Sequence, residues 1–558
     1  MKKILSYVVI VAMLVTLVTP SVSLAAGNNQ TTNTKEVTDA GSMPVGDEVI
    51  VLTQGDKTIG SYKTFEEAFK NIADYDYKTN KTEYVITLQK DIQEDVVIPA
   101  NKKIAIDLNG NKLTNVKSHT IYNSTNIRVI DKKGGGVVDN ITHGKAAVYN
   151  NIKSNIKLEG GTFTRSKEAS TGDSSSGNNS FYVVKNFGTM TIYDGVSVKF
   201  SDHNLGLFSS LIGNGWQDAA AAEAGKNGEP KPSAATRKAA VLDIKGGKFV
   251  GGQITIKNDD FGELTVSGGE IVQPSEERAA IANNHKATIK GGFIEAKGKN
   301  GQAIYSRYFN TGANKGELKI QGGFFKSTGT VIQAQKGSIL DVSAGKFETS
   351  SKDSYIFDVW ENVNSKIKNG QYIGVTVDKV ANREDVFVEG YGPQTDANGN
   401  ITVDVTEAAT VATVTDKEGK VFRYTSLGSA LSNALSGSTV KLHKNITLEK
   451  DVKTSEYGIT FDLNGFSVNG ENVESSDGVL YMRTTYGAKP VEGVDSTMRI
   501  INSKETGGEI KGTLPVKFNS GNSTFELPGE IGSGVKLVTL EQDADAIKLG
   551  TASYLVYS

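Results

Sequence analysis

Between Val241 and Tyr372 the chain repeats one pattern of apolar and polar positions. In each repeat, apolar residues stand four and two places before a glycine turn, with polar residues between them. Side chains alternate between the two faces of a β-strand, so this pattern predicts one half-buried strand per repeat. An apolar residue three places after the first turn residue returns to the interior. The segments that carry the pattern are 242–249, 264–271, 287–294, 318–325, 340–347 and, in a weaker form, 365–372.

The spacing of these repeats predicts a parallel β-helix. Successive turns lie 22, 23, 31, 22 and 25 residues apart, which leaves room for a strand, a corner and further strand segments. Glycine tolerates positive φ and close backbone approach, which a tight corner requires. One such unit cannot bury its apolar face alone, so neighbouring units must stack. We therefore expect an all-β fold built on a right-handed parallel β-helix, with like residues stacked about 4.8 Å apart. A leucine-rich repeat has a similar period but a different leucine and asparagine spacing.

A second pattern precedes the repeats and occurs twice. Val49–Leu52 and Thr58–Tyr62 predict a hairpin, and Thr64–Glu67 predicts the capping-box start of a helix with one apolar face. The hairpin and helix recur 362 residues later, and the following strands recur at offsets of 354 to 355. Such a helix would cover the open end of a β-helix, where unpaired strand edges invite aggregation. The apolar faces comprise Phe65, Ala68, Phe69 and Ile72 in the first copy and Leu427, Ala430, Leu431, Ala434 and Leu435 in the second.

The duplication predicts the domain organisation. We expect a signal peptide at 1–25, a flexible leader at 26–46, a first β-helix domain at 47–405 and a second, shorter β-helix domain at 406–558. A hairpin turn at Asp396–Gly399 marks the end of the first domain. The insertions 166–180 and 204–240 leave the first ladder as loops, which lie on a binding face or are simply tolerated at the surface.

The first residues predict export. Lys2 and Lys3 precede a mostly apolar stretch at 5–18, and Ser23–Ala25 supplies small residues for cleavage. A membrane anchor is the alternative, but the stretch is short and is followed by proline. The chain has no cysteine, which rules out disulfides and a lipid-modified cysteine and fits a Gram-positive-like exporter. We expect a secreted protein, associated with the cell surface or free, with no membrane span after signal cleavage.

The net charge of the chain makes nucleic acid an unfavourable general partner. The formal net charge is −2, and it becomes −4 once the two signal lysines are removed, which argues against general nucleic-acid binding. Within the repeats, Lys245, Lys290 and Lys368 stand just before turns. They contact an anionic polymer or form a solvated sheet face.

Three features of the sequence are similar to those of a known protein family. The run Thr87–Ile92, the segment Asp107–Gly110 and the Gly-Gly-x-Phe coils resemble the pectin-lyase-like β-helix proteins, secreted or surface proteins of Gram-positive bacteria. The resemblance covers nearly all of the mature chain, in both of its duplicated parts, and it implies a β-helix fold and export. It includes no catalytic motif from which catalytic residues of this chain could be assigned. Well-studied relatives cleave or bind polysaccharides, so a glycan partner is implied by analogy alone.

The residue types that carry catalysis form no recognisable group. Five histidines are scattered without metal-ligand spacing, and no serine-hydrolase, phosphate-loop or zinc-protease motif occurs. Asn258–Asp260 is the best acidic corner, and it forms a solvated turn or a metal site. The Asp107–Gly110 motif and its copy, with Asp462 and Asn464, bind a ligand or calcium, or satisfy backbone groups at a turn. We identify no catalytic residue and predict no cofactor and no metal.

The most suggestive feature for ligand binding is aromatic. Phe293 and Phe324 lie two places after their turns on consecutive coils, where strand alternation points both rings outward. Between them an enlarged connection carries Tyr305, Arg307 and Tyr308, followed by another phenylalanine. Sugar rings stack on exposed aromatic rings, and arginine adds hydrogen-bond donors. The alternative is a local bulge that turns these rings inward.

These observations favour an exported, non-catalytic β-helix protein that presents an extended surface for adhesion or carbohydrate binding. Its partner would be an extracellular or cell-wall glycan or a host surface. A polysaccharide lyase or glycoside hydrolase acting on an acidic polysaccharide is the alternative, and it predicts acids that converge with Lys or Arg in a groove. A structural spacer is a third possibility and predicts no glycan binding.

Overall fold

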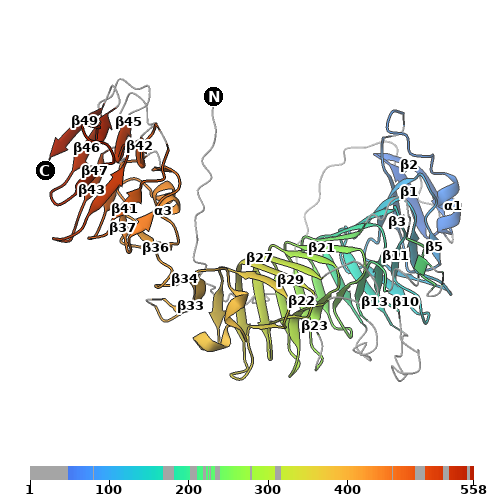
Figure 1. Cartoon of the computed structure of the whole chain (residues 1–558). Coiled ribbons are helices and arrows are strands. Elements are labelled where there is room, and N and C mark those ends of the chain that lie inside the picture. Colours follow the sequence, from blue (N-terminus) through green and yellow to red (C-terminus); the bar gives the residue numbers. More distant parts are fainter. Residues whose placement is uncertain are drawn as a thin grey trace, which may run out of the picture. The chain divides into compact units, whose positions relative to one another are not determined.

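The computed structural model describes residues 48–558 except 80, 167–180, 201–209, 218–221, 224, 226–227, 233–238, 277–278, 308–315, 397, 455–456, 475, 484–496, 520–526, 550–552 and 558. The predicted signal peptide and leader lie outside these residues. The described chain consists mostly of strands in long parallel sheets, with few helices (Figure 1). This all-β arrangement is consistent with a β-helix or other solenoid.

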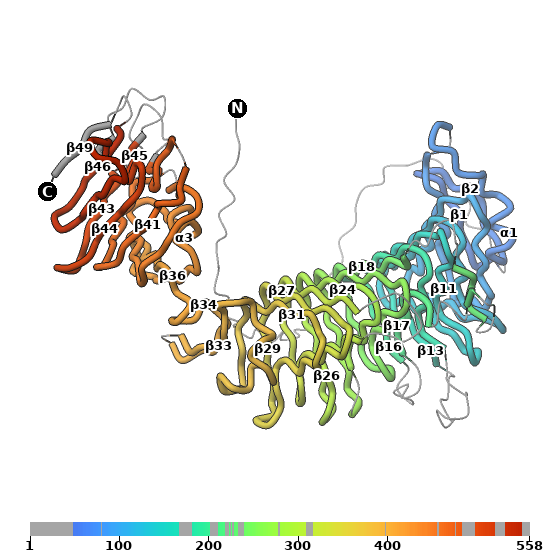
Figure 2. The backbone as a smooth tube through the Cα atoms, viewed as in Figure 1, coloured from blue at the N-terminus to red at the C-terminus, as the bar shows by residue number. Residues whose placement is uncertain are grey.

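The strands before Thr406 form three parallel ladders, which we call ladders 1, 2 and 3. Each coil of the backbone contributes one strand to each ladder before the chain moves on to the next coil (Figure 2). Ladder 1 comprises β3 (Tyr84–Leu88), β6 (Lys103–Asp107), β9 (Asn126–Ile130), β12 (Asn155–Leu158), β15 (Thr189–Ile192), β18 (Ala240–Ile244), β21 (Gly262–Val266), β24 (Lys286–Ile289), β27 (Glu317–Ser327), β29 (Ile339–Thr349) and β31 (Asn364–Ile367).

Ladder 2 follows the glycine corner and ladder 3 completes each coil. Ladder 2 comprises β4 (Ile92–Gln93), β7 (Lys112–Thr114), β10 (Val137–Asn140), β13 (Gly161–Arg165), β16 (Val196–Lys199), β19 (Lys248–Val250), β22 (Glu270–Gln273), β25 (Phe293–Ala296), the second halves of β27 and β29, and β32 (Gln371–Ile373). Ladder 3 comprises β5 (Val96–Val97), β8 (Ile121–Asn123), β11 (Val148–Asn150), β14 (Val184–Asn186), β17 (Ile212–Asn214), β20 (Ile256–Asn258), β23 (Ala279–Asn283), β26 (Gln302–Ser306), β28 (Ile332–Ala334) and β30 (Phe357–Val359). The glycine-flanked segments therefore pair in parallel, as the repeat predicts.

The glycine pairs form the corners between ladders 1 and 2 for two different steric reasons. A Cβ on Gly291 would lie 2.5 Å from the carbonyl oxygen of Ser267 on the preceding coil, so the first glycine allows close backbone approach. Gly292 has φ +91°, a conformation that residues with a side chain rarely adopt. The inward positions around such corners are apolar and fully buried, as at Leu242, Ile244 and Phe249.

Antiparallel hairpins and short helices precede and follow these ladders. β1 (Ile50–Gln54) pairs with β2 (Lys57–Tyr62) and also with β3. Helix α1 (Phe65–Lys70) begins at Thr64, whose side chain accepts a hydrogen bond from the Glu67 N–H at 3.1 Å. Its predicted apolar face is buried. Beyond the 3₁₀ turns η2 (Val377–Lys379) and η3 (Glu384–Val386), β33 (Tyr391–Thr395) and β34 (Ile401–Val405) form the hairpin predicted around Asp396–Gly399.

The described strands after Thr406 form three further sheets around a separate hydrophobic cluster. The first sheet contains β35 (Ala412–Thr415), β36 (Val421–Tyr424), β37 (Thr439–Leu442), β40 (Thr460–Asp462), β43 (Met498–Ile501), β46 (Leu527–Ile531) and β49 (Ser553–Tyr557). The second contains β38 (Ile446–Thr447), β41 (Val468–Gly470), β44 (Glu509–Gly512) and β47 (Lys536–Thr539), and the third contains β39 (Val452–Lys453), β42 (Leu480–Arg483), β45 (Val516–Asn519) and β48 (Ile547–Leu549). Four of the five predicted apolar residues are buried: Leu427, Ala430 and Leu431 on helix α3 (Leu427–Asn433) and Ala434 at its C-cap. Leu435 is a correction: it lies past the end of the helix and is 62% exposed.

The duplication extends to individual hydrogen bonds. Asp107 accepts a hydrogen bond from the Asn109 N–H at 3.0 Å, and the Asn109 amide donates to a backbone carbonyl on the preceding strand. Asp462 and Asn464 make the same two bonds, with the N–H to Asp462 distance at 2.8 Å. Both asparagines have positive φ. The motif therefore satisfies backbone groups at a turn in both copies, the structural alternative that the sequence leaves open.

Candidate functional site

Phe293 and Phe324 lie side by side on the outer face of ladder 2. The two residues are register partners on β25 and β27, and their ring centroids are 5.2 Å apart with a tilt of 52°. Both rings are partly exposed, whereas the next residue on each strand, Ile294 and Phe325, is completely buried. The inward-turning bulge does not occur at these rings, although β27 shifts register before Phe324.

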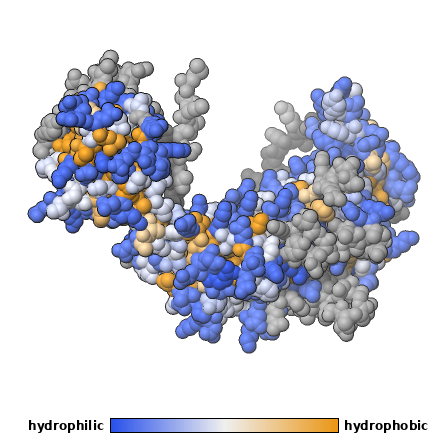
Figure 3. Space-filling view, viewed as in Figure 1, coloured by the Kyte–Doolittle hydropathy of each residue, from blue (hydrophilic) through white to orange (hydrophobic). Residues whose placement is uncertain are grey.

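Cationic and ion-paired side chains surround the phenylalanine pair. The Lys346 ammonium lies 4.5 Å from the centroid of the Phe324 ring, within range of a cation–π interaction. On the preceding strand of ladder 2, β22, the register partner of Phe293 is Glu270, whose carboxylate forms an ion pair with Lys248 at 3.3 Å. The face of the molecule visible in Figure 3 is mostly hydrophilic with smaller apolar areas. The pair thus provides a small apolar platform with a cation at one end.

The structure places Tyr305 and Arg307 on a different sheet from the phenylalanine pair. Tyr305 belongs to β26 of ladder 3, and the Arg307 guanidinium lies 5.6 Å from the centroid of its ring. Arg307 Nε donates to the side chain of Asn284 at 2.9 Å. Tyr308, the remaining residue of the predicted site, lies outside the described residues. The structure therefore divides four of the five predicted residues into two separate pairs, Phe293 with Phe324 on ladder 2, and Tyr305 on ladder 3 with Arg307 just past the end of its strand.

The acidic corner Asn258–Asp260 is not a solvated turn. Asp259 is 1% exposed and Asp260 is 3% exposed. Lys257 lies 3.4 Å from the Asp259 carboxylate, which also accepts a hydrogen bond from Asn284 at 2.9 Å. Burial has the largest single effect and lowers the pKa of Lys257, but the charge and hydrogen bond of Asp259 together with Tyr182 outweigh it and raise this pKa above its ordinary value. Lys257 on the same coil and Asn284 on the next coil thus compensate the charge of the buried Asp259.

A ladder of buried asparagines runs along ladder 3, and the sequence analysis missed it. Each asparagine donates from Nδ2 to the Oδ1 of the next one, at 2.7 to 2.8 Å, and every member is fully buried. The last member donates to Ser306 Oγ at 3.2 Å. The signal is an apolar-x-Asn tripeptide that recurs once per coil, independently of the glycine pairs. The ladder comprises Asn123, Asn150, Asn186, Asn214, Asn258 and Asn283.

The predicted insertion 204–240 is not a loop throughout, because Ile212–Asn214 form β17 of ladder 3, and described residues after β17 pack against that ladder. Trp216 is 2% exposed, its ring centroid lies 5.1 Å from that of Phe187, and its indole N–H donates to the Pro230 carbonyl at 2.7 Å. Lys185 is fully buried and lies 3.4 Å from the Glu229 carboxylate. These contacts form a satellite core outside the ladders, so Trp216 acts in packing rather than in ligand binding.

His119 lies in an aromatic cluster on the outer side of ladder 3. Its ring centroid is 4.5 Å from that of Tyr149, which stacks on Tyr122 at 5.1 Å with an interplanar angle of 11°. His119 Nδ1 accepts a hydrogen bond from a backbone N–H at 2.9 Å, as a neutral imidazole can. Burial, with the charges of Lys145 and Arg165, lowers the pKa of His119 to about 4. In the part of the chain that the structure describes, no three His, Asp or Glu side chains group as metal ligands would.

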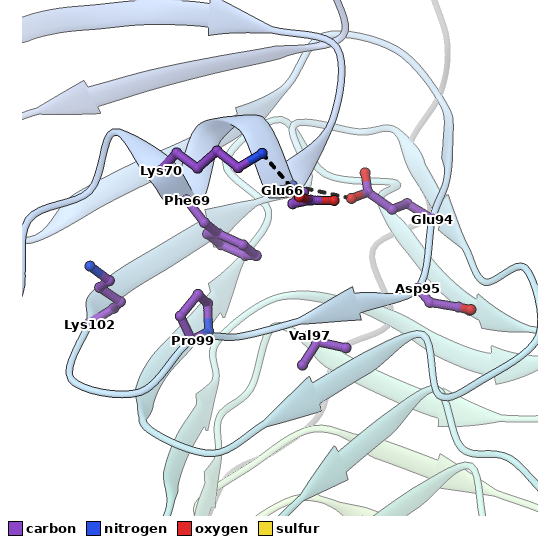
Figure 4. Close-up of a pocket in the computed structure, with 8 residues that line it drawn as sticks. All are labelled: Glu66, Phe69, Lys70, Glu94, Asp95, Val97, Pro99 and Lys102. Carbon is purple, nitrogen blue, oxygen red and sulfur yellow. Dashed lines mark hydrogen bonds and ion pairs between the residues drawn. The ribbon is translucent and has the colours of Figure 1, made fainter.

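Two cavities lie near the ends of the ladders. The first, of about 480 Å³, lies beside α1 and is lined by Glu66, Phe69, Lys70, Glu94, Asp95, Val97, Pro99 and Lys102 (Figure 4). Its acids are engaged: Glu94 accepts hydrogen bonds from the first N–H groups of α1, and Asp95 accepts three from a neighbouring coil. The second, of about 720 Å³, lies beside η2 and η3 and includes Arg383, which is bound to Asp385 and to the Trp360 carbonyl. These polar groups serve the local fold.

Comparisons of the chain with family models, with curated proteins and with solved structures find no match. None of the helices in the described ranges is both long enough and apolar enough to span a membrane.

Proposed function

We propose that the protein is exported and acts without catalysis, presenting the outer face of a β-helix for adhesion or glycan binding. The proposed architecture is two tandem right-handed β-helices, each with a hairpin and a helix covering its first coil. The hairpin, the helix and the turn hydrogen bonds that occur in both copies support this arrangement. The signal-like first 25 residues and the resemblance to pectin-lyase-like surface proteins support export to the cell surface or beyond.

The observation that carries the proposal is the outward phenylalanine pair. Two partly exposed rings lie 5.2 Å apart on neighbouring coils, at positions where the other described coils of the repeat carry polar side chains. An apolar ring left in water gains little from folding, whereas a sugar face that stacks on it buries both surfaces. Charged side chains around the pair supply hydrogen-bond donors and acceptors for hydroxyl groups.

A glycan array tests the proposal with the purified chain lacking residues 1–25. The double variant Phe293→Ala/Phe324→Ala removes the platform, and we expect it to lose most of the glycan signal. The matched control is Tyr75→Ala/Tyr77→Ala, which removes two aromatic rings that are 42% and 65% exposed elsewhere on the surface. We expect this control to bind like the parent chain.

The same preparation separates the alternatives. Unchanged glycan binding by the phenylalanine variant rejects the platform, and absence of binding by the parent chain favours a structural spacer. Release of reducing ends or unsaturated products from an acidic polysaccharide would identify an enzyme instead. The cluster around Asp259 offers no obvious site for that chemistry, because a substrate cannot reach a carboxylate that is 1% exposed.

A further inference from the structure

The lysines on ladders 1 and 2 fall into two groups according to their partners. Some are ion-paired: Lys248 pairs with Glu270 at 3.3 Å, Lys286 with Glu263 at 3.5 Å and Lys326 with Glu348 at 2.8 Å. Five other outward lysines, on or directly beside β24, β27, β29 and β31, form no ion pair with any carboxylate among the described residues. We call these five the basic strip: Lys290, Lys319, Lys346, Lys366 and Lys368.

The basic strip begins on the two coils of the phenylalanine pair, with Lys290 and Lys319, and continues over the next two coils with Lys346, Lys366 and Lys368. Lys319 and Lys346 belong to β27 and β29, which run through the corner as single strands and join ladders 1 and 2 into one sheet. Lys346 contacts the Phe324 ring. Four of the five lysines are exposed, and Lys346 is half-buried. The rings and the cations thus form one continuous outer surface.

The charge on this surface is poorly compensated. Asp341 is the register partner of both Lys319 and Lys366, so one carboxylate stands between two ammonium groups in that column. The neighbouring acid Glu348 is already paired with Lys326 at 2.8 Å. The five cations occupy different columns of four successive coils, which repeat about every 4.8 Å, and so form a cluster of positive charge. Such a cluster raises the local concentration of a polyanion even though the whole chain is slightly acidic.

We propose that the ligand of the phenylalanine pair is an anionic glycan, whose sugar faces stack on the rings while its carboxylates or sulfates contact the basic strip. This inference rests on the proposed glycan-binding function and adds the charge of the ligand. A polymer with an acidic group on regularly spaced sugars matches both parts of the surface. A neutral glycan would use the rings alone and leave the lysines solvated.

Binding to four immobilised polymers tests the inference: alginate for carboxylates, dextran sulfate for sulfates, dextran as the neutral glycan, and double-stranded DNA as a polyanion without exposed sugar faces. We expect the parent chain to prefer alginate or dextran sulfate over dextran and DNA, and to lose affinity as salt is raised. Lys319→Gln/Lys366→Gln should weaken this binding roughly tenfold, from two surface charge contacts. The control Lys453→Gln/Lys511→Gln changes two ion-paired lysines on strands after Thr406 and should have little effect.

The possible results distinguish failure of the anionic-ligand inference from failure of the proposed glycan-binding function. Equal, salt-independent binding to dextran that still depends on Phe293 and Phe324 overturns the anionic ligand and leaves glycan binding intact. Equal binding to DNA overturns the glycan specificity. If none of the glycans binds, this inference fails, and the glycan array then decides whether the proposed function fails with it. The salt dependence of the parent chain gives an answer even if a lysine variant folds poorly.

Discussion

Asn186 is the position at which the asparagine ladder is best tested. Its Nδ2 donates to Asn214 Oδ1 at 2.7 Å and to the Val241 carbonyl at 3.0 Å. Its Oδ1 accepts from Asn150 Nδ2 at 2.7 Å and from the Gly188 N–H at 3.2 Å. The side chain is fully buried. Asn186→Ala therefore leaves several buried polar groups without this partner.

The expected loss of stability follows from those groups. A buried donor or acceptor left unsatisfied costs about 1–3 kcal/mol. Asn150 keeps a second acceptor, the Thr189 carbonyl, so the loss falls mainly on the Gly188 N–H, Asn214 Oδ1 and the Val241 carbonyl. Three such groups give a total of about 3–9 kcal/mol, which is large beside the ~0.5 kcal/mol typical of surface substitutions.

Urea unfolding followed by tryptophan fluorescence measures this loss, with hydrogen exchange locating it along the ladder. The matched control is Asn364→Ala on β31, which makes the same chemical change at an exposed position. Asn186→Asp adds a second comparison, because it keeps the size but removes the Nδ2 donor, and should destabilise as well. Equal urea midpoints for Asn186→Ala and Asn364→Ala would refute the claim that the ladder stabilises the coils. Midpoints are compared directly because long repeat arrays need not unfold in two states.

Two further predictions concern pH and the corners. His119 has a pKa lowered to about 4 by burial and nearby cations, so the unfolded chain takes up a proton before the folded chain does. The free energy of unfolding should therefore fall by up to about 3 kcal/mol as the pH drops from about 6.5 to about 4. The variant His119→Phe should flatten this part of the curve of stability against pH. The control His143→Phe, at an exposed position, should leave the curve unchanged. The variant Gly292→Ala places a side chain at a residue with φ +91°, so it should lower the free energy of unfolding by at least about 1 kcal/mol. The midpoint of urea unfolding measures this loss. A midpoint equal to that of the parent chain would contradict the steric explanation of the corner.

The sequence predicts the corners and the first strand of each coil because glycine pairs and alternating apolar residues act locally. Ladder 3 was harder to foresee, since its strands are short and carry no glycine pair. This explains why Tyr305 was assigned to an enlarged connection next to the phenylalanines, although it belongs to a strand of another sheet. It also explains the error at Asp259: three adjacent polar residues suggest a solvated turn, and the compensating Asn284 lies on the next coil.

The buried core and the proposed binding surface use alternate positions of the same strands. On ladder 2, the inward residues Phe249, Ile271, Ile294, Phe325 and Phe347 are all apolar and fully buried. The outward residues of the same coils are Lys248, Glu270, Phe293, Phe324 and Lys346, which differ in charge and polarity. Side chains that face water contribute little to folding, so the outward column can vary in chemistry without loss of the coil. A change of ligand then requires only outward substitutions, and the phenylalanine and lysine variants report on binding while the inward column maintains the fold.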